Sequence, residues 1–211
     1  MKTDELIDAL AVGLEPVKPA RASLLLLAVA AAAAVVGVVM LLGVRPDLVE
    51  AIAGPSPWLK ALYTLALTIA AVRLATRLGR PGVDVRPAAL ALVALVALVA
   101  AAGVIEVAIT APDQRLAVWL GRTWEVCGRN ILLISAVAGP FVFLSARRLA
   151  PTRPSAAGAV LGLTAGAVAA TAYGLLHCPE ATIAFVATWY TLGVAAAGAV
   201  GAIIGRFALR W

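Results

Sequence analysis

Charged side chains are scarce in this chain of 211 residues: they make up 13% of it, with a single histidine and only two cysteines. Soluble domains carry about a quarter charged residues, so an ordinary water-exposed surface is excluded. The two cysteines, Cys127 and Cys178, fit no zinc-ribbon or CxxC spacing. The chain also lacks a GxSxG elbow, a phosphate-binding glycine loop and an HExxH pair, so we expect it not to be an enzyme.

Apolar residues are abundant, at 63% of the chain with a mean hydropathy of +1.01. Six apolar runs of about 17 to 23 residues are each long enough to cross a hydrocarbon core about 30 Å thick. The sequence therefore predicts an all-α, polytopic membrane protein, a six-transmembrane-helix bundle with a short N-terminal cytoplasmic amphipathic helix. The expected domains are a segment at 1–21 and a bundle at 22–211, with helices at about 22–43, 56–75, 88–110, 128–144, 156–176 and 182–204.

Lysine and arginine give the expected orientation. Twelve of the 17 basic residues fall on the side that six crossings assign to both termini. The positive-inside rule makes that side cytoplasmic, so we expect a multi-pass membrane protein with both termini in the cytoplasm. His177, Cys127 and Cys178 then lie on the outer side. The basic residues are scattered at the ends of apolar runs, which predicts no direct binding of nucleic acid.

The segment 1–21 carries an acidic amphipathic pattern. From Met1 to Glu15 one lysine stands against four acidic side chains, a net charge of 1 − 4 = −3. Such a charge disfavours binding to anionic lipid. About ten helical residues are too few for a stable isolated helix, so the segment is either a solubilising terminus or a helix for a groove on a basic protein. The expected contact residues are Asp4, Glu5, Leu6, Ile7, Asp8, Leu10 and Leu14.

Small residues recur every four positions in the last two apolar runs. Such stripes let two helix backbones approach closely inside a membrane, which predicts a tight antiparallel hairpin. Chance spacing in an Ala/Gly-rich sequence is the alternative. The expected packing residues are Gly158, Gly162, Gly166 and Gly174 in the fifth run, with Gly193, Gly201 and Gly205 in the sixth.

The polar stretch from Leu176 to Glu180 separates these two runs. Topology places Cys178 at the same depth as Cys127, with His177, Glu180 and, less directly, Glu106 nearby. Such a set suits zinc or copper(I). A metal or thiol-reactive sensing site, a disulfide and two unlinked apolar cysteines remain as alternatives. For Glu106, an ion pair with Arg122 or Arg129 is favoured over ligation.

Several blocks together resemble the NrsF-like anti-sigma factors, six-helix inner-membrane proteins of bacteria that hold an extracytoplasmic-function sigma factor inactive. The blocks are the opening Met1 to Leu10, the segment Trp124 to Cys127, and His177 to Glu180 followed by Phe185 and Trp189 to Gly193. The resemblance implies that the N-terminal segment binds the sigma factor and that Cys127 and Cys178 detect a stress, such as a heavy or transition metal. His177 and Glu180 are added from their position alone.

The sequence thus predicts an anti-sigma factor that releases its sigma factor when the outer cysteines meet a metal or a thiol-reactive agent. The expected partners are the sigma factor and membrane lipids, and homo-oligomers are left open. A small membrane transporter or enzyme that uses the same outer Cys/His site is the alternative. That alternative predicts a transport or enzyme activity that does not change when the N-terminal segment is lost.

Overall fold

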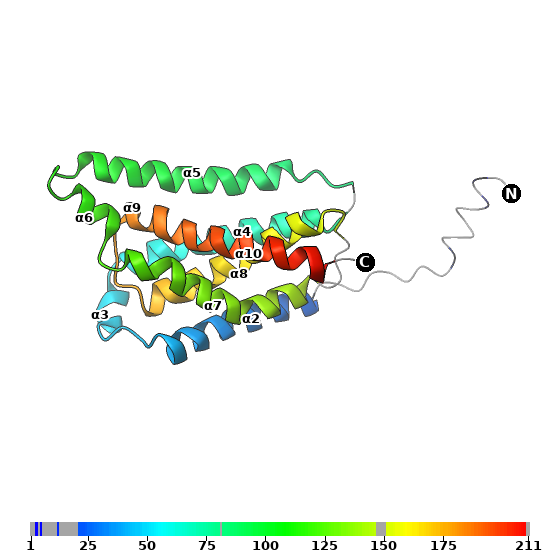
Figure 1. Cartoon of the computed structure of the whole chain (residues 1–211), viewed down its shortest axis with the longest axis horizontal. Coiled ribbons are helices and arrows are strands. Elements are labelled where there is room, and N and C mark those ends of the chain that lie inside the picture. Colours follow the sequence, from blue (N-terminus) through cyan, green and yellow to red (C-terminus); the bar gives the residue numbers. More distant parts are fainter. Residues whose placement is uncertain are drawn as a thin grey trace.

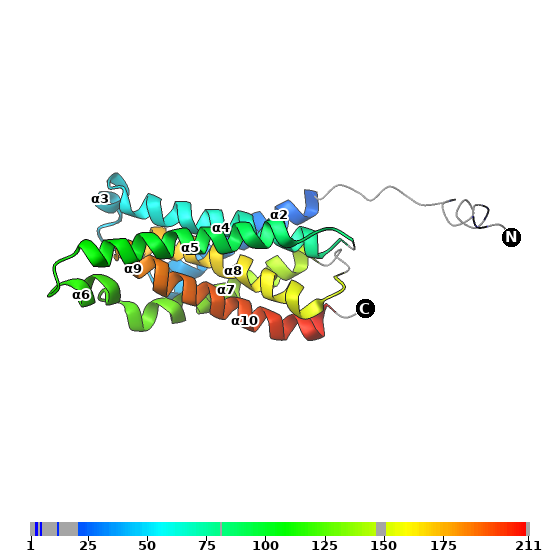
Figure 2. The same ribbon diagram turned by 90° about the horizontal axis from the view of Figure 1, so that it is seen from above.

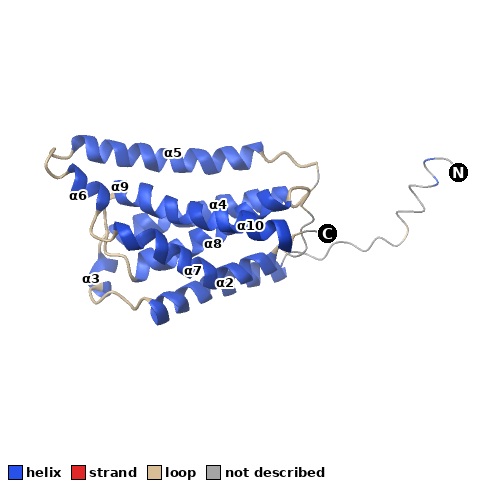
Figure 3. Ribbon diagram, in the orientation of Figure 1, coloured by secondary structure: helices blue, strands red, loops and turns tan. Residues whose placement is uncertain are grey.

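The computed structural model describes residues 21–80, 82–146 and 151–209, together with positions 3, 5 and 12. Helices are the only regular elements in these residues, and no strand occurs among them (Figure 3). Of the expected contact residues in the N-terminal segment, all but Glu5 lie outside the described residues, as does much of the expected amphipathic helix.

Six helical segments are long and apolar enough to cross a membrane. They are α2 (Arg21–Leu41), α4 (Ser56–Leu78), α5 (Arg86–Ile109), α7 (Trp124–Ser145), α8 (Pro154–Leu176), and a continuous segment made of α9 (Ile183–Phe185), a π-helical turn η1 (Val186–Tyr190) and α10 (Thr191–Ala208). Helix α2 begins at the end of the bundle at which α10 ends, and the short helices α3 (Leu48–Ala53) and α6 (Arg115–Leu120) lie at the other end (Figure 1).

Helix α8 forms the centre of the bundle. Buried residues make up 72% of its most apolar window, against 11% for α5, which lies along one side of the bundle (Figure 1) and passes in front of it in the view from above (Figure 2). Ala and Gly dominate the buried positions of α8, so the neighbouring helices can pack closely against it. The core of the protein therefore surrounds α8, while most of the apolar surface of α5 faces outward.

The helix bounds differ from the expected ones at both ends of the bundle, by at most four residues at any one bound. Helix α7 begins at Trp124 rather than at residue 128, with Glu125 in its first turn, where a carboxylate complements the helix dipole. The six-residue helices α3 and α6 were not expected, because each lies in a connection outside the apolar runs. Pro140 lies inside α7 and does not end it.

Glycines bring α8 and α10 into backbone contact. A Cβ atom added at Gly158 would lie 2.6 Å from Gly205 Cα, and one added at Gly201 would lie 2.7 Å from Gly162 Cα. At Gly166 the nearest atoms belong to Val194 and Ala197 of α10. Gly174 and Gly193 have other neighbours, since Gly174 faces the Tyr190 side chain and Gly193 faces Ile131 of α7.

We expect Gly158→Ala to destabilise the bundle by about 1 to 3 kcal/mol, because the added methyl group must push α8 and α10 apart. Thermal denaturation of the purified protein measures the change. Gly139→Ala in α7 is the matched control, since no atom lies within 4 Å of its added Cβ. Equal melting temperatures for the two variants would contradict close backbone packing.

Candidate functional site

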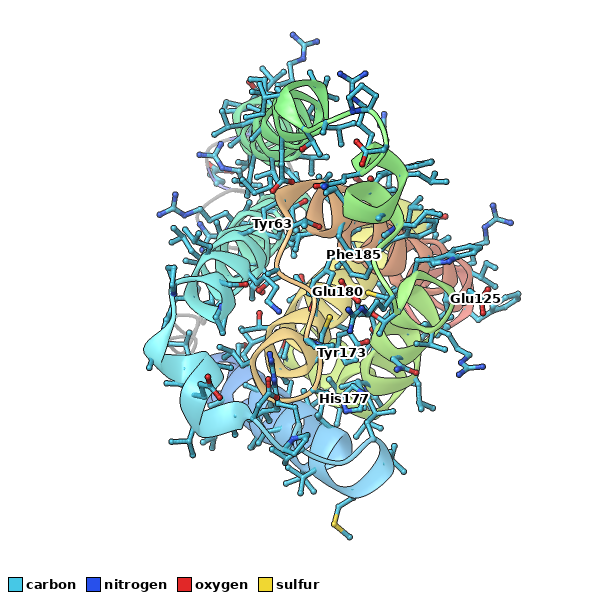
Figure 4. The ribbon with its side chains drawn as sticks, turned by 90° about the vertical axis from the view of Figure 1, so that its left-hand side faces the viewer. Tyr63, Glu125, Tyr173, His177, Glu180 and Phe185 are labelled. Atoms are coloured by element: carbon cyan, nitrogen blue, oxygen red, sulfur yellow. The ribbon has the colours of Figure 1, made fainter. Side chains whose placement is uncertain are left out.

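The polar corner, residues 177–182, joins α8 to α9 at the α3–α6 end of the bundle. Figure 4 views this end and places Glu180 and Tyr173 over its centre, His177 near them, and Glu125 at the rim. The corner has no regular secondary structure of its own, so side chains from the surrounding helices satisfy its backbone groups. Four chain segments that are distant in sequence meet at this corner.

The structure brings Cys127 and Cys178 together. Cys127 lies in the first turn of α7, where its backbone N–H donates to Thr123 O at 2.9 Å. Both side chains are completely buried, both are free thiols, and the two lie within hydrogen-bonding reach of each other. Two sulfurs from different segments thus share one enclosed position.

Two basic side chains hold the backbone of the polar corner. Lys60 Nζ, on α4, donates to Cys178 O at 2.9 Å and to Glu180 O at 2.7 Å, although the residue is only 3% exposed. Arg45 Nη1 donates to the same Cys178 oxygen at 3.2 Å, and the Arg45 guanidinium also pairs with Asp47. We refer to Lys60 and Arg45 as the basic clamp. It fixes the position of the Cys178 backbone carbonyl.

The side chains of His177 and Glu180 contact groups other than the two thiols. His177 Nδ1 donates to Gly43 O at 2.9 Å, and its ring lies 5.5 Å from that of Tyr173. The Glu180 carboxylate accepts from the backbone N–H of Arg122 at 2.8 Å and from the Thr123 hydroxyl at 3.3 Å. These bonds tie the corner to the α2–α3 connection and to the turn before α7.

Glu106 has a different partner from the arginines considered above. Its carboxylate, on α5, accepts from the backbone N–H of Ala184 at 2.7 Å. Ala184 lies in the first turn of the segment that continues into α10, where unpaired N–H groups and the helix dipole favour a carboxylate. Glu106 thereby anchors α5 to the start of this segment. No ion pair of Glu106 occurs among the described residues, whose salt bridge is Arg45 with Asp47.

The donor set bears on which metals the corner suits. Within the described ranges no group of three or more His, Cys, Asp or Glu side chains converges as a metal site would require. A structural zinc site needs four such ligands, whereas two thiolates suffice for a soft ion such as copper(I). The arrangement can also lose two electrons to form a disulfide, because both thiols are free and adjacent.

The surroundings favour the thiolate form of Cys178. The hydrogen-bonding contact with Cys127 is the largest cause that lowers the pKa of Cys178 below the ordinary thiol value, and the charge of Lys60 acts in the same direction. Burial opposes both but is outweighed. Cys178 is therefore the more easily activated of the two thiols.

Two residues that complete the site were not singled out from the sequence. Lys60 carried a signal, since a basic residue inside an apolar run is usually paired or functional. Tyr190 carried none, because a tyrosine beside Trp189 is equally typical of an interfacial position. Its side chain is instead fully buried next to Tyr173 and Phe185.

Gly121 lets the turn before α7 receive Glu180. Its φ of +61° and ψ of −167° lie in a region that only glycine adopts readily. An added Cβ would lie 2.6 Å from Phe185 Cδ2 and 2.7 Å from Glu180 Oε2. The glycine is thus required both by its backbone conformation and by the carboxylate beside it.

We expect Gly121→Ala to lower stability by about 2 kcal/mol or more, because backbone strain and steric displacement of Glu180 act together. Gly82→Ala is the control, since Gly82 also has a positive φ, +79°, but an added Cβ there meets no atom within 4 Å. Comparison of the two melting temperatures separates the contact from the strain. An equal loss in both variants would show that Glu180 can move at no cost.

Comparisons with known proteins agree over the whole chain. The family model described as "Negative regulator of sigma F" (NrsF) matches residues 10–211. The chain is 42% identical over 220 residues to the anti-sigma-F factor NrsF of Caulobacter vibrioides, and 40% identical over 216 residues to the probable anti-sigma-F factor NrsF of Azospira oryzae; each alignment covers both chains in full. No solved structure matches the chain.

Proposed function

This chain belongs to the NrsF family, and on that premise we propose that it is an inner-membrane anti-sigma factor whose cysteine pair controls release of its sigma factor. Residues 1–21 bind an extracytoplasmic-function sigma factor in the cytoplasm. Cys127 and Cys178 face the periplasmic side and react with a metal ion or a thiol-reactive agent. Full-length identity of 40% or more to anti-sigma-F factors supports the sigma factor as the partner.

The single observation that carries the sensing half is the burial of two free thiols in one position beside the basic clamp. Structural cysteines can be buried anywhere in a core. Here they lie where the α2–α3 connection, α4, α7 and the end of α8 meet, so a bond between the sulfurs, or a metal held by both, would act on these segments together.

The positions of the helix ends support a cysteine site and a sigma-binding segment on opposite sides of the membrane. The polar corner and the N-terminal end of α2 lie at opposite ends of the bundle (Figure 1). Arg206 of α10 lies at the same end of the bundle as the first residue of α2. The positive-inside rule assigns this end to the cytoplasm. The cysteine pair then faces the periplasm, where metals and oxidants arrive first.

Coupling between the two ends requires that the reacted cysteine site favour one helix arrangement over the other. The same difference in free energy then changes the affinity for the sigma factor. Typical couplings of about 1 to 3 kcal/mol would lower that affinity by about 5- to 150-fold. Both thiols are buried, so the polar corner must open or shift for an agent to reach them.

The test is a reporter driven by the sigma factor in cells that carry wild-type protein, Cys127→Ser or Cys178→Ser. Wild-type cells should respond to diamide, a thiol oxidant, and to a copper salt, while both variants keep the sigma factor captured and give no response. Pull-down of the sigma factor without added agent checks that each variant is folded. A wild-type response in both variants would overturn the sensing proposal.

A further inference from the structure

The Tyr190 hydroxyl is buried without a hydrogen-bond partner. Among the buried side-chain nitrogen and oxygen atoms of the described residues, Tyr190 Oη alone has none. The residue is fully buried, and its ring lies 5.9 Å from that of Tyr173. Burial of a hydroxyl without a partner is costly, so the position calls for an explanation.

Neighbouring contacts hold the hydroxyl where it is. Tyr190 is the last residue of the π-helical turn η1, a rare element that often marks functional sites. Trp189 Nε1, in the same turn, donates to Trp119 O at 3.2 Å, and the Thr191 hydroxyl shares a hydrogen bond of 2.7 Å with the Tyr63 hydroxyl. The side chains on both sides of Tyr190 are therefore anchored to other elements, which holds the backbone of Tyr190 in place.

Cys178 is the group that the hydroxyl faces. The Tyr190 and Cys178 side chains lie within hydrogen-bonding reach, although no bond of acceptable geometry forms. Gly174 leaves the space that the hydroxyl occupies, since an added Cβ there would lie 3.0 Å from Tyr190 Oη. A neutral thiol sulfur is a weak acceptor, whereas a sulfur that carries negative charge is a strong one.

We propose that Tyr190 is a positioning residue of the cysteine site, whose hydroxyl donates to the sulfur of Cys178 when that sulfur gains negative charge as a metal-bound or reactive thiolate. This inference rests on the proposed sensing function. The hydroxyl without a partner marks the neutral thiol, and the new bond marks the charged sulfur. The stabilisation is present only when the sulfur carries negative charge, so it favours reaction of Cys178 without strengthening the fold that holds the neutral thiol.

The bond would also connect the cysteine site to α10. Tyr190 directly precedes Thr191, the first residue of α10, whose glycines pack against α8. Movement of Tyr190 toward Cys178 would thus act at the junction of the π turn and a helix that runs to the opposite end of the bundle (Figure 1).

Tyr190→Phe tests the proposal, because it removes an oxygen that has no partner and keeps the ring. Silver ion serves as the probe, since it is soft, binds thiolates and does not itself need an oxidant. In the full-length purified protein, we expect the half-saturating silver concentration to rise about tenfold, as for loss of one hydrogen bond to a charged acceptor. The melting temperature without silver should stay equal or rise. Unchanged silver affinity would overturn the proposal.

Two further variants keep this result decisive. Tyr63→Phe removes a hydroxyl that has a partner, so it should lower the melting temperature slightly and leave silver binding unchanged. Gly174→Ala keeps the Tyr190 hydroxyl but displaces it by a few tenths of an ångström, and should weaken silver binding less than Tyr190→Phe does. Wild-type silver binding in Gly174→Ala together with Tyr190→Phe would contradict the role of Tyr190. Wild-type binding in Cys127→Ser and Cys178→Ser would instead overturn the proposed function.

Discussion

A chain that lacks residues 1–15 is expected to lose capture of its sigma factor while its six-helix bundle stays folded. The deleted segment carries the acidic side chains and the apolar positions Leu6, Ile7 and Leu10, which recur at helical spacing. Truncation of a few central apolar contacts commonly costs 2 kcal/mol or more each, so loss of them all should lower affinity by more than about 100-fold. Co-purification of the sigma factor with the full-length and truncated proteins measures the effect.

Matched variants of the same segment separate its two faces. Leu6→Ala with Leu10→Ala should weaken capture strongly, because apolar side chains form the energetic centre of a helix in a groove. Asp4→Asn with Asp8→Asn should mainly slow association and reduce its dependence on salt. Full capture by the truncated chain would place the sigma-binding surface elsewhere and would favour the transporter or enzyme alternative.

Lys60→Met is expected to loosen the polar corner and to shift the titration of Cys178. The substitution leaves Glu180 O without the donor that Lys60 provides, while Cys178 O keeps Arg45. Loss of this charged donor from a partly buried carbonyl costs about 1 to 3 kcal/mol, which the melting temperature of the purified variant should reveal. Arg45→Met is the control, since Arg45 also donates to Cys178 O but its guanidinium is partly exposed and pairs with Asp47. Equal losses of stability would show that burial of Lys60 adds nothing.

The pH dependence of Cys178 gives a second measure of the same clamp. The pKa of Cys178 is lowered by contact with Cys127 first and by the charge of Lys60 second, so its thiolate persists to lower pH than in an ordinary cysteine. The stability that this adds is present above the ordinary thiol pKa and is lost as the pH falls through the lowered pKa. Lys60→Met should raise the midpoint. The ultraviolet absorbance of the thiolate, taken as the difference from Cys178→Ser, measures it, and an unchanged midpoint would rule out the influence of Lys60.

Much of the fold follows from the sequence because hydrophobic length alone identifies helices that can cross a membrane. Six such helices are present, with no strand among the described residues. The short helices α3 and α6 and the π turn at 186–190 could not be predicted, since their bounds depend on contacts such as Trp119 with Thr188. The local sequence pattern predicts little about elements whose bounds depend on tertiary contacts.

From the sequence, the site could be predicted only to the extent that membrane topology places residues at the same depth. Equal depth in the predicted bundle placed Cys127 near Cys178, and the structure brings the two together. Depth does not specify which way a side chain turns, so the sequence grouped His177, Glu180 and Glu106 with the thiols. Their hydrogen bonds go instead to backbone groups and, for Glu180, also to the Thr123 hydroxyl. Lys60 and Tyr190 depend on helix rotation, which the apolar runs do not fix.

The most direct test of the account is the affinity of the purified full-length protein for its sigma factor, before and after reaction of the cysteine pair. Wild-type protein, Cys127→Ser and Cys178→Ser are each treated with diamide, and the dissociation constant is measured in every case. We expect diamide to raise the dissociation constant of the wild-type complex by about 5- to 150-fold and to leave both variants unchanged. The same affinity before and after treatment of the wild-type protein, or an equal change in all three proteins, would contradict control of sigma-factor capture by Cys127 and Cys178.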